Sequence, residues 1–323
     1  MQLRITSDDT IPKKSQNKNP TEMIINLTNE TIPMDIQRVM INNPYLTILD
    51  FSYSRPSLQQ MKLISETIPI IKNLTRLDFC RMELDHSAIE ILCTGIQSHI
   101  NLISIDLTHN RIGELGAKSI GHLLQHLTIQ ELKLGSNHIG AKGIHYISKG
   151  LIENTNLIEL ELSSNAIGDQ GAMSIASALT LNKTLRKIHL NNNAIKSQGI
   201  MHMHESLKSN LNITELQIFG NRFDSTNLID IYQLLVRNIT REKQIQSDYI
   251  TLLSISRSLV LLSQLPIDIR MLILEYFKGV LTGNEFNSLY PIVLDRFLIG
   301  HLMMCGNQNL MYNCRILQSR NKS

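Results

Sequence analysis

The sequence predicts an α/β solenoid: a curved stack of strand–helix units with a parallel sheet on its concave face and helices on its convex face, followed by an α-helical C-terminal module. The first observation is a repeat of 27 or 28 residues that occurs seven times across residues 45–239. The second is a change of apolar period inside each unit, from alternation in the first half to helical spacing in the second. The units begin at Tyr45, Asn73, Asn101, Thr128, Asn156, Thr184 and Asn212.

One unit shows both halves most clearly. The stretch LIELEL, residues 157–162, alternates apolar and polar side chains, which indicates a short strand with one buried face. Apolar side chains at Ala172, Ile175 and Leu179 then follow helical spacing, which indicates an amphipathic helix of about three turns. One strand and one helix cannot bury such faces alone, so neighbouring units must stack. Because a helix (about 10 Å) is wider than the strand spacing (about 4.8 Å), the stack curves with its strands inside.

An asparagine follows the last strand-like leucine by three residues in five of the units. There the chain turns toward the helix, and its buried main-chain groups lack a partner in the sheet. An amide offers both a donor and an acceptor, so a row of stacked asparagines would satisfy those groups. Ser54 and Met82 stand at this position in the first two units, so the row should be irregular at the N-terminal end. We expect a structural role for Asn110, Asn137, Asn165, Asn193 and Asn221.

The pattern LxxLxLxxNxIGxxGAxxIAxxL, which residues 157–179 match almost fully, resembles the leucine-rich-repeat family in its ribonuclease-inhibitor-type subclass. The resemblance covers residues 45–239. It implies a scaffold that holds proteins on the concave sheet or on the rim loops, and it transfers no individual functional residue. A ribonuclease-binding inhibitor is a third, disfavoured function, because those inhibitors are strongly acidic and rich in cysteine, and this chain is neither.

The two ends of the chain depart from the repeat. Residues 1–20 are polar, and we expect a disordered tail. Residues 21–44 have the character of a degraded first unit, with Ile25 and Leu27 in strand positions and DIQRVMI as a short helix, and would cap the first core layer. Residues 240–323 lose the period and predict three or more helices, either a cap on the last repeat or a small bundle.

One stretch of the C-terminal module favours an alternative function. LPIDIRMLILEYF, residues 265–277, is similar to the opening of an F-box. That resemblance implies a ubiquitin-ligase substrate adaptor, in which Leu265, Pro266 and Ile269 would contact the Skp1 adaptor protein and the repeats would select the substrate.

Side chains between the apolar residues of each strand should point out of the sheet on the concave face. The central position is acidic in three successive units, and neighbouring like charges cost stability that an unused surface need not bear. We therefore expect a protein partner with a basic patch, and an aromatic anchor at the other end of the face. The candidate partner-binding residues are Asp50, Asp78, Asp106, Lys133, Glu159, Glu161, Lys187, His189, Gln217 and Phe219.

Catalytic, metal-binding and cofactor motifs are missing from the sequence. His202 and His204 are two residues apart and so lie on different faces of a helix, and the four cysteines lack CxxC spacing. We therefore expect no enzyme activity and no cofactor.

Charge and hydropathy exclude other partners. The net charge is only +3 and forms no block, so we expect no nucleic-acid partner. Charged residues interrupt the longest apolar stretches, at Arg257 and at Asp295, which predicts no membrane span. Since the N-terminus lacks a hydrophobic signal core, we expect a cytosolic protein.

The composition, rich in Ile, Asn and Lys, suits an AT-rich genome. With the eukaryote-like repeat type, it makes the chain similar to the leucine-rich-repeat effectors of intracellular bacteria such as Legionella. That resemblance implies export into a host cell without an N-terminal signal peptide. Composition alone fits an AT-rich protist's own protein equally well.

Overall fold

The structure is a computed structural model that describes residues 2–6, 22–26, 35–43, 45–97, 99–223 and 228–262. The chain divides into two compact units, Met1–Arg241 and Glu242–Ser323. The first unit holds the repeats. Of the second unit, the structure describes the continuation of one helix to Leu262.

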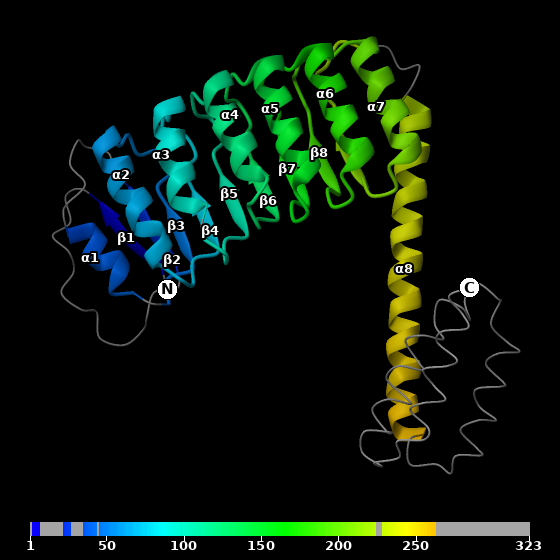
Figure 1. Cartoon of the computed structure of the whole chain (residues 1–323), viewed down its shortest axis with the longest axis horizontal. Coiled ribbons are helices and arrows are strands. Elements are labelled where there is room, and N and C mark those ends of the chain that lie inside the picture. Colours follow the sequence, from blue (N-terminus) through cyan, green and yellow to red (C-terminus); the bar gives the residue numbers. More distant parts are fainter. Residues whose placement is uncertain are drawn as a thin grey trace, which may run out of the picture. The chain divides into compact units, whose positions relative to one another are not determined.

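The first unit is built on a nine-stranded parallel sheet whose strands follow one another in sequence order. In Figure 1 the strands form one layer and the helices pack against it as a second layer. The alternating strand segments of the seven units form the last seven strands, as the sequence predicts. The strands are β1 (Gln2–Thr6), β2 (Glu22–Asn26), β3 (Ile48–Asp50), β4 (Arg76–Asp78), β5 (Ser104–Asp106), β6 (Glu131–Lys133), β7 (Glu159–Glu161), β8 (Lys187–His189) and β9 (Glu215–Gln217).

A helix follows each strand from β2 to β9. Each repeat helix buries its apolar stripe on the sheet, and the α/β solenoid that the sequence predicts is confirmed. The helices are α1 (Asp35–Ile41), α2 (Leu58–Thr67), the 3-10 turn η1 (Ile68–Ile70), α3 (His86–Ile96), α4 (Gly113–Leu124), α5 (Gly140–Glu153), α6 (Gly168–Leu181), α7 (Ser197–Ser209) and α8 (Leu228–Leu262).

The five asparagines of the predicted row lie one above another where the strands turn toward the helices. Each amide oxygen accepts the main-chain N–H of the preceding repeat, as Asn165 Oδ1 does from Asn137 (2.9 Å) and Ile139 (3.3 Å). Each amide nitrogen donates to carbonyl oxygens of its own and the preceding strand segment, as Asn165 Nδ2 does to Leu162 (3.0 Å) and Leu134 (2.9 Å). The row continues through Asn110, Asn193 and Asn221.

A second amide row, which the sequence analysis missed, lies at the opposite ends of the helices. Asn154, Asn182 and Asn210 follow helices α5, α6 and α7 and are almost fully buried. The oxygen of Asn182 accepts from the N–H groups of Thr184 and Leu185, and its nitrogen donates to the carbonyl of Leu151 at 2.7 Å. This row joins each helix end to the strand that follows.

Glycines allow neighbouring helices to approach closely. A Cβ atom built on Gly121 of α4 would lie 2.4 Å from the carbonyl oxygen of Tyr146 in α5, and one on Gly150 would lie 2.1 Å from the carbonyl oxygen of Gly121. Any larger residue would push α4 and α5 apart, because carbonyl groups inside a helix cannot move aside.

The N-terminal end agrees with the expected degraded unit in β2 and in α1, which is the DIQRVMI stretch. It differs from the expected disordered tail, because Gln2–Thr6 form β1 and pair in parallel with β2. The tail therefore supplies a strand, and the unit that follows is not the outermost one of the sheet.

The C-terminal helix begins at Leu228, before the expected boundary at residue 240. Its first turns bury Ile231 and Leu235, and Arg237 donates to the carbonyl of Leu207 at the end of α7 (2.8 Å). Asn238 extends the second amide row by donating to the carbonyl of Asn210. The start of α8 thus covers the last repeat. The F-box-like segment 265–277 lies outside the described residues.

Candidate functional site

The concave face is a floor made of the first and third residues of β3–β9. The sheet register aligns the third residues in one column, so Asp50 lies beside Asp78 and Asp78 beside Asp106. The column continues through Lys133, Glu161, His189 and Gln217. A parallel column holds the first residues, among them Glu159 and Lys187. The structure thus brings together on one surface the charged residues that the sequence singled out.

The three aspartates also have a local structural role, which the sequence analysis did not foresee. Each carboxylate accepts the main-chain N–H two residues later: Asp50 from Ser52 at 2.8 Å, Asp78 from Cys80 at 3.1 Å, and Asp106 from Thr108 at 2.9 Å. The side chains of Asp78 and Asp106 are only 17% and 15% exposed. The premise that three adjacent aspartates need a partner to justify them is therefore wrong, because the turn itself uses them.

Burial and like charge still act on this column. Burial raises the pKa of Asp78, and the neighbouring Asp106 and Asp50 raise it further, against the N–H of Cys80 and the cation of Arg76. Arg76 lies 3.5 Å from the Asp78 carboxylate, and Lys133 lies 4.0 Å from that of Asp106. Cations of the floor therefore offset part of its negative charge.

The middle of the floor forms a connected polar network. Glu131 accepts from the Ser104 hydroxyl at 2.7 Å and pairs with Lys133 at 3.0 Å. Burial alone would raise the pKa of Glu131, but these two hydrogen bonds together lower it. One repeat further, Lys187 pairs with Glu159 at 3.2 Å.

Two buried polar atoms on β7 and β8 have no hydrogen-bond partner in the described part of the chain. They are Oε2 of Glu161 and Nε2 of His189. The His189 nitrogen lies 3.4 Å from the Glu215 carboxylate, close enough for an ion pair when the imidazole is protonated but without hydrogen-bond geometry. Because both atoms are buried, they are a local cost to the fold and not contact points for a partner.

A further column consists of the residues two positions after the last strand residue of each repeat. Phe219 is its one bulky side chain. Its counterparts in the other repeats are small: Ser52, Cys80, Thr108, Gly135, Ser163 and Asn191. The ring is 72% exposed, while its main-chain N–H donates to Asn191 Oδ1 at 2.8 Å. An exposed aromatic side chain is thus held on an anchored main chain.

A rim borders the floor where the strands turn toward the helices, and its composition was missed from the sequence. We define the rim as the first left-handed residue after each strand and the residue two positions later. The first set, with φ from 55° to 69°, is Tyr53, Arg81, His109, Ser136, Ser164, Asn192 and Gly220; in the second set, Glu83, His138, Ala166 and Ala194 are left-handed too. The second set is Arg55, Glu83, Arg111, His138, Ala166, Ala194 and Arg222.

The first three repeats place large side chains on the rim. Tyr53 is 61% exposed, and the Arg81 guanidinium lies 5.6 Å from the centre of its ring. Arg55 and Arg111 both pair with the carboxylate of Glu83, at 2.5 and 2.9 Å. A left-handed conformation costs a residue other than glycine about 1 kcal/mol, and asparagine less. The sequence did carry a signal for the rim. At the same aligned position, the last repeats have Asn192 and Gly220, which suit a left-handed turn, and the first repeats have Tyr53 and Arg81, which suit it less.

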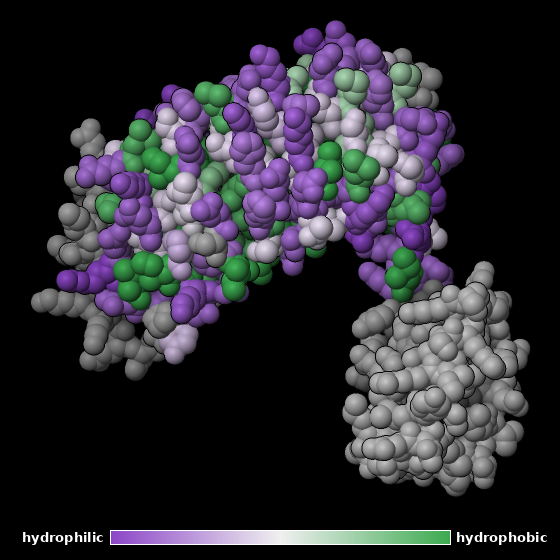
Figure 2. Space-filling model, in the orientation of Figure 1, coloured by the Kyte–Doolittle hydropathy of each residue, from purple (hydrophilic) through white to green (hydrophobic). Residues whose placement is uncertain are grey.

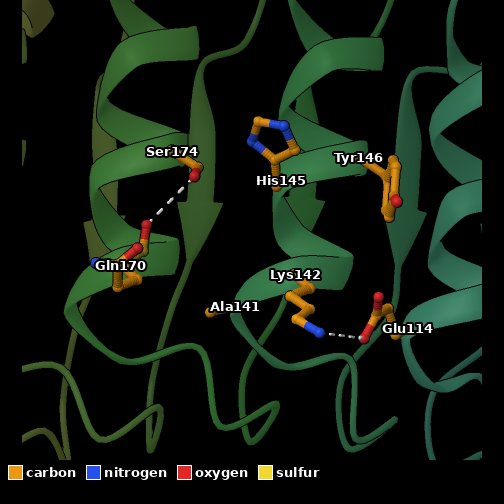
Figure 3. A pocket seen from close by; sticks show the side chains of 7 residues that line it. All are labelled: Glu114, Ala141, Lys142, His145, Tyr146, Gln170 and Ser174. Carbon is orange, nitrogen blue, oxygen red and sulfur yellow. Dashed lines mark hydrogen bonds and ion pairs between the residues drawn. The ribbon is translucent and has the colours of Figure 1, made fainter.

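The helix-bearing face offers a weaker candidate. Figure 2 shows this face as mainly hydrophilic, with small hydrophobic patches separated from one another. A hollow of about 250 Å³ opens between α4, α5 and α6 (Figure 3). It is lined by Glu114, Ala141, Lys142, His145, Tyr146, Gln170 and Ser174. The ion pair in this hollow, between Lys142 and Glu114 at 3.9 Å, is exposed to solvent. The lining therefore does not have the character of a ligand-binding site.

The chemistry of the described residues gives no positive sign of catalysis. They contain no group of three or more side chains that could hold a metal ion. Burial raises the pKa of Cys80 to about 11 and that of Cys93 to about 12, so both stay protonated thiols at neutral pH. Within the same described segments, no helix is long and apolar enough to cross a membrane.

Comparison with known proteins agrees with the repeat. A family model described as "Leucine Rich repeat" matches residues 98–121, 125–148, 153–176 and 181–202. A search of curated proteins finds no match. Among solved structures, the tropomodulin C-terminal domain of Caenorhabditis elegans is 14% identical, with a TM-score of 0.44, over 48% of this chain and 95% of its own.

A second solved structure, leiomodin-1 actin-binding site 2, is 13% identical, with a TM-score of 0.28, over 69% of this chain and 99% of its own. Neither TM-score reaches 0.5, so no inference about a partner rests on these two structures. The repeat match and the sheet architecture agree with each other. Residues 45–223 therefore have the fold of a leucine-rich-repeat protein.

Proposed function

We propose that the chain is a non-catalytic scaffold that binds a protein partner on its concave floor. The observation that carries this proposal is Phe219, an aromatic ring 72% exposed beside the floor, in a column that is otherwise small. A rigid, exposed aromatic ring is the kind of side chain that dominates the free energy of binding at protein interfaces.

The charge of the floor supports a partner with a basic patch. Seven carboxylates stand on the floor, against the three cations of Arg76, Lys133 and Lys187. Because Asp78 and Asp106 are partly recessed, they would act mainly by steering association and less by direct contact. The carboxylates on the floor are Asp50, Asp78, Asp106, Glu131, Glu159, Glu161 and Glu215.

The test is capture of partners from a eukaryotic cell lysate, followed by surface plasmon resonance with the identified partner. We expect Phe219→Ala to raise the off-rate at least about tenfold. Leu181→Ala is the matched control, because Leu181 is exposed to 59% on the end of α6, away from the floor. Equal binding by the two variants would remove the concave floor as the docking site.

The acidic column is tested separately with Asp78→Asn combined with Asp106→Asn. Asparagine keeps an oxygen for the N–H groups of Cys80 and Thr108, which lysine would not. The double variant should slow association and reduce its dependence on salt. An unchanged on-rate at low salt would contradict the basic-patch partner while leaving the Phe219 anchor in place.

The composition and repeat type support a narrower role as a bacterial effector delivered to the cytosol of a host cell. A translocation reporter fused to the chain, expressed in bacteria with and without a functional secretion system, tests this role.

The alternative role, an F-box-like adaptor, rests on Leu265, Pro266 and Ile269 alone. It predicts that Skp1 co-purifies with the full chain and is lost in Leu265→Ala combined with Ile269→Ala.

A further inference from the structure

The rim of the first three repeats has a chemistry opposite to that of the floor beside it. The floor there carries Asp50, Asp78 and Asp106, which are recessed and bonded to their own turns. The rim carries Arg55, exposed to 74%, and Arg111, exposed to 68%, together with the exposed Arg81. A molecule that approaches this end from the rim therefore meets three guanidinium groups and the single carboxylate of Glu83 before it meets the aspartates of the floor.

These large rim side chains do not serve the stability of the fold. Tyr53, Arg81 and His109 hold left-handed main-chain conformations that glycine or asparagine adopts with less strain, and the last two repeats use Asn192 and Gly220 there. All three side chains are exposed, so they gain little core packing in return. Strain kept at exposed positions points to a use outside the fold.

The guanidinium groups keep binding capacity. Glu83 receives one nitrogen from Arg55 and one from Arg111, and a guanidinium has five N–H donors, so most donors of both residues are not taken up by this carboxylate. Arg81 lies over the Tyr53 ring, which fixes its plane. Planar, oriented guanidinium groups suit carboxylate ligands, which they can bind through two parallel hydrogen bonds.

The spacing suits an extended chain. The main chains of Arg55 and Arg111 stand two strands apart, about 10 Å at sheet spacing, although one nitrogen of each guanidinium group converges on the Glu83 carboxylate. In an extended peptide, residues i and i+3 are separated by about the same distance. The surface ends after Arg111, because the next three repeats carry mainly small side chains on the rim: Ser136, Ser164, Ala166 and Ala194.

We propose that the rim of repeats one to three, through Tyr53, Arg55, Arg81 and Arg111, binds an extended acidic segment of a protein. Charge complementarity selects the acidic ligand, and the aromatic ring beside Arg81 accommodates an apolar side chain between the acidic ones. This surface is separate from the floor and from Phe219. A partner that engages both would carry a basic patch and an acidic segment.

The experiment measures fluorescence anisotropy of a labelled dodecapeptide, with glutamate at every third position in a glycine–serine background and one central tyrosine. The full chain should bind this peptide and not the version with lysine for glutamate. Arg81→Glu combined with Arg111→Glu should weaken binding at least about tenfold at low salt. Arg222→Glu, on the same rim four repeats away from Arg111, is the matched control and should leave binding unchanged.

Arg81→Gly separates this role from a structural one. Because glycine relieves the left-handed strain, the variant should keep its Tm or raise it by up to about 4 °C, while peptide affinity falls. A lower Tm with unchanged affinity would overturn the proposal, as would equal binding of the glutamate and lysine peptides. A single-stranded 12-nucleotide DNA that binds the rim more tightly than the peptide would overturn it too, since the surface would then be a general polyanion site. None of these results depends on Phe219, so failure here leaves the floor proposal standing.

Discussion

The first two repeats and the five that follow share a main-chain path but hold it with different chemistry. In the later repeats, Asn110 to Asn221 form an unbroken amide row through the strand–helix turns. In the first two repeats the row position holds Ser54 and Met82, both buried. Beside them, Phe51 and Phe79 stack with ring centroids 5.3 Å apart and planes parallel to within 1°.

The hydrogen bonds of the amide row reach one repeat beyond its first asparagine, Asn110. Met82 needs no amide for its own N–H, because Asn110 Oδ1 accepts from both Met82 and Leu84 at 3.0 Å. Each asparagine therefore serves the repeat before it. The stacked Phe pair stands at the strand position that leucine holds in Leu107, Leu134 and Leu162, and adds apolar contact in the first two repeats. The left-handed residues run through both halves, so the main-chain path itself does not depend on the amides.

The largest expected effect is at the centre of the row. Asn165→Ala removes the acceptor for Asn137 and Ile139 and the donors for Leu134, Leu162 and Ser163. We expect the free energy of unfolding to fall by about 3 kcal/mol, because these groups are buried and would lose their hydrogen-bond partners. Chemical denaturation measures it, with the exposed Asn156→Ala as a control. A loss below about 1 kcal/mol would show that the row is not what holds the later repeats.

The second amide row should matter somewhat less. Asn182→Ala leaves the N–H groups of Thr184 and Leu185 and the carbonyl of Leu151 without this partner. We expect a loss of about 2 kcal/mol, measured by the same denaturation experiment. Hydrogen exchange should locate the loosening between α6 and β8. Loosening at the strand–helix turns instead would mean that the two rows are not independent.

The smallest expected effect concerns charge at the N-terminal end. Since the pKa of Asp78 is raised in the folded protein, the folded state binds this proton more tightly than the unfolded state does. The resulting destabilisation is present at pH 7 and disappears as the pH falls toward the normal value for aspartate. Asp78→Asn should therefore stabilise the protein at pH 7 by up to about 0.5 kcal/mol and lose this advantage near pH 4. Thermal unfolding at both pH values tests the sign, and a destabilised variant at pH 7 would contradict it.

Sequence periodicity was sufficient for the architecture of the repeats. Positions that face the core repeat every 27 or 28 residues, so the strands, their register and the first amide row follow from alignment of the units. The second row carried a comparable signal, with Asn154, Asn182 and Asn210 each three residues before the first apolar strand residue, but the sequence analysis did not use it. The sequence did not show that one helix, α8, runs from the seventh repeat across residue 240, because its apolar positions no longer follow the repeat.

The site was less predictable because its residues are the ones that vary between units. Alignment gives the column in which Asp78 stands, but the bond from Cys80 to its carboxylate depends on turn geometry that is visible only in three dimensions. The rim depends on main-chain conformation at Tyr53 and Arg81, where residue type alone does not indicate a left-handed turn. The sequence did single out Phe219 as an exposed aromatic residue, and the structure shows it 72% exposed.

The glycine contacts between α4 and α5 have a mechanical consequence. A repeat stack bends because its helix layer is thicker than its strand layer, and the bend per repeat grows with the helix–helix separation. At Gly121 and Gly150 the main chains of α4 and α5 come into close contact, which limits the bend between these two repeats. These glycines therefore help to set the radius of the sheet at β5 and β6, to which a partner on the concave face must conform. Single alanine substitutions at these glycines would change that radius without touching any residue on the concave face.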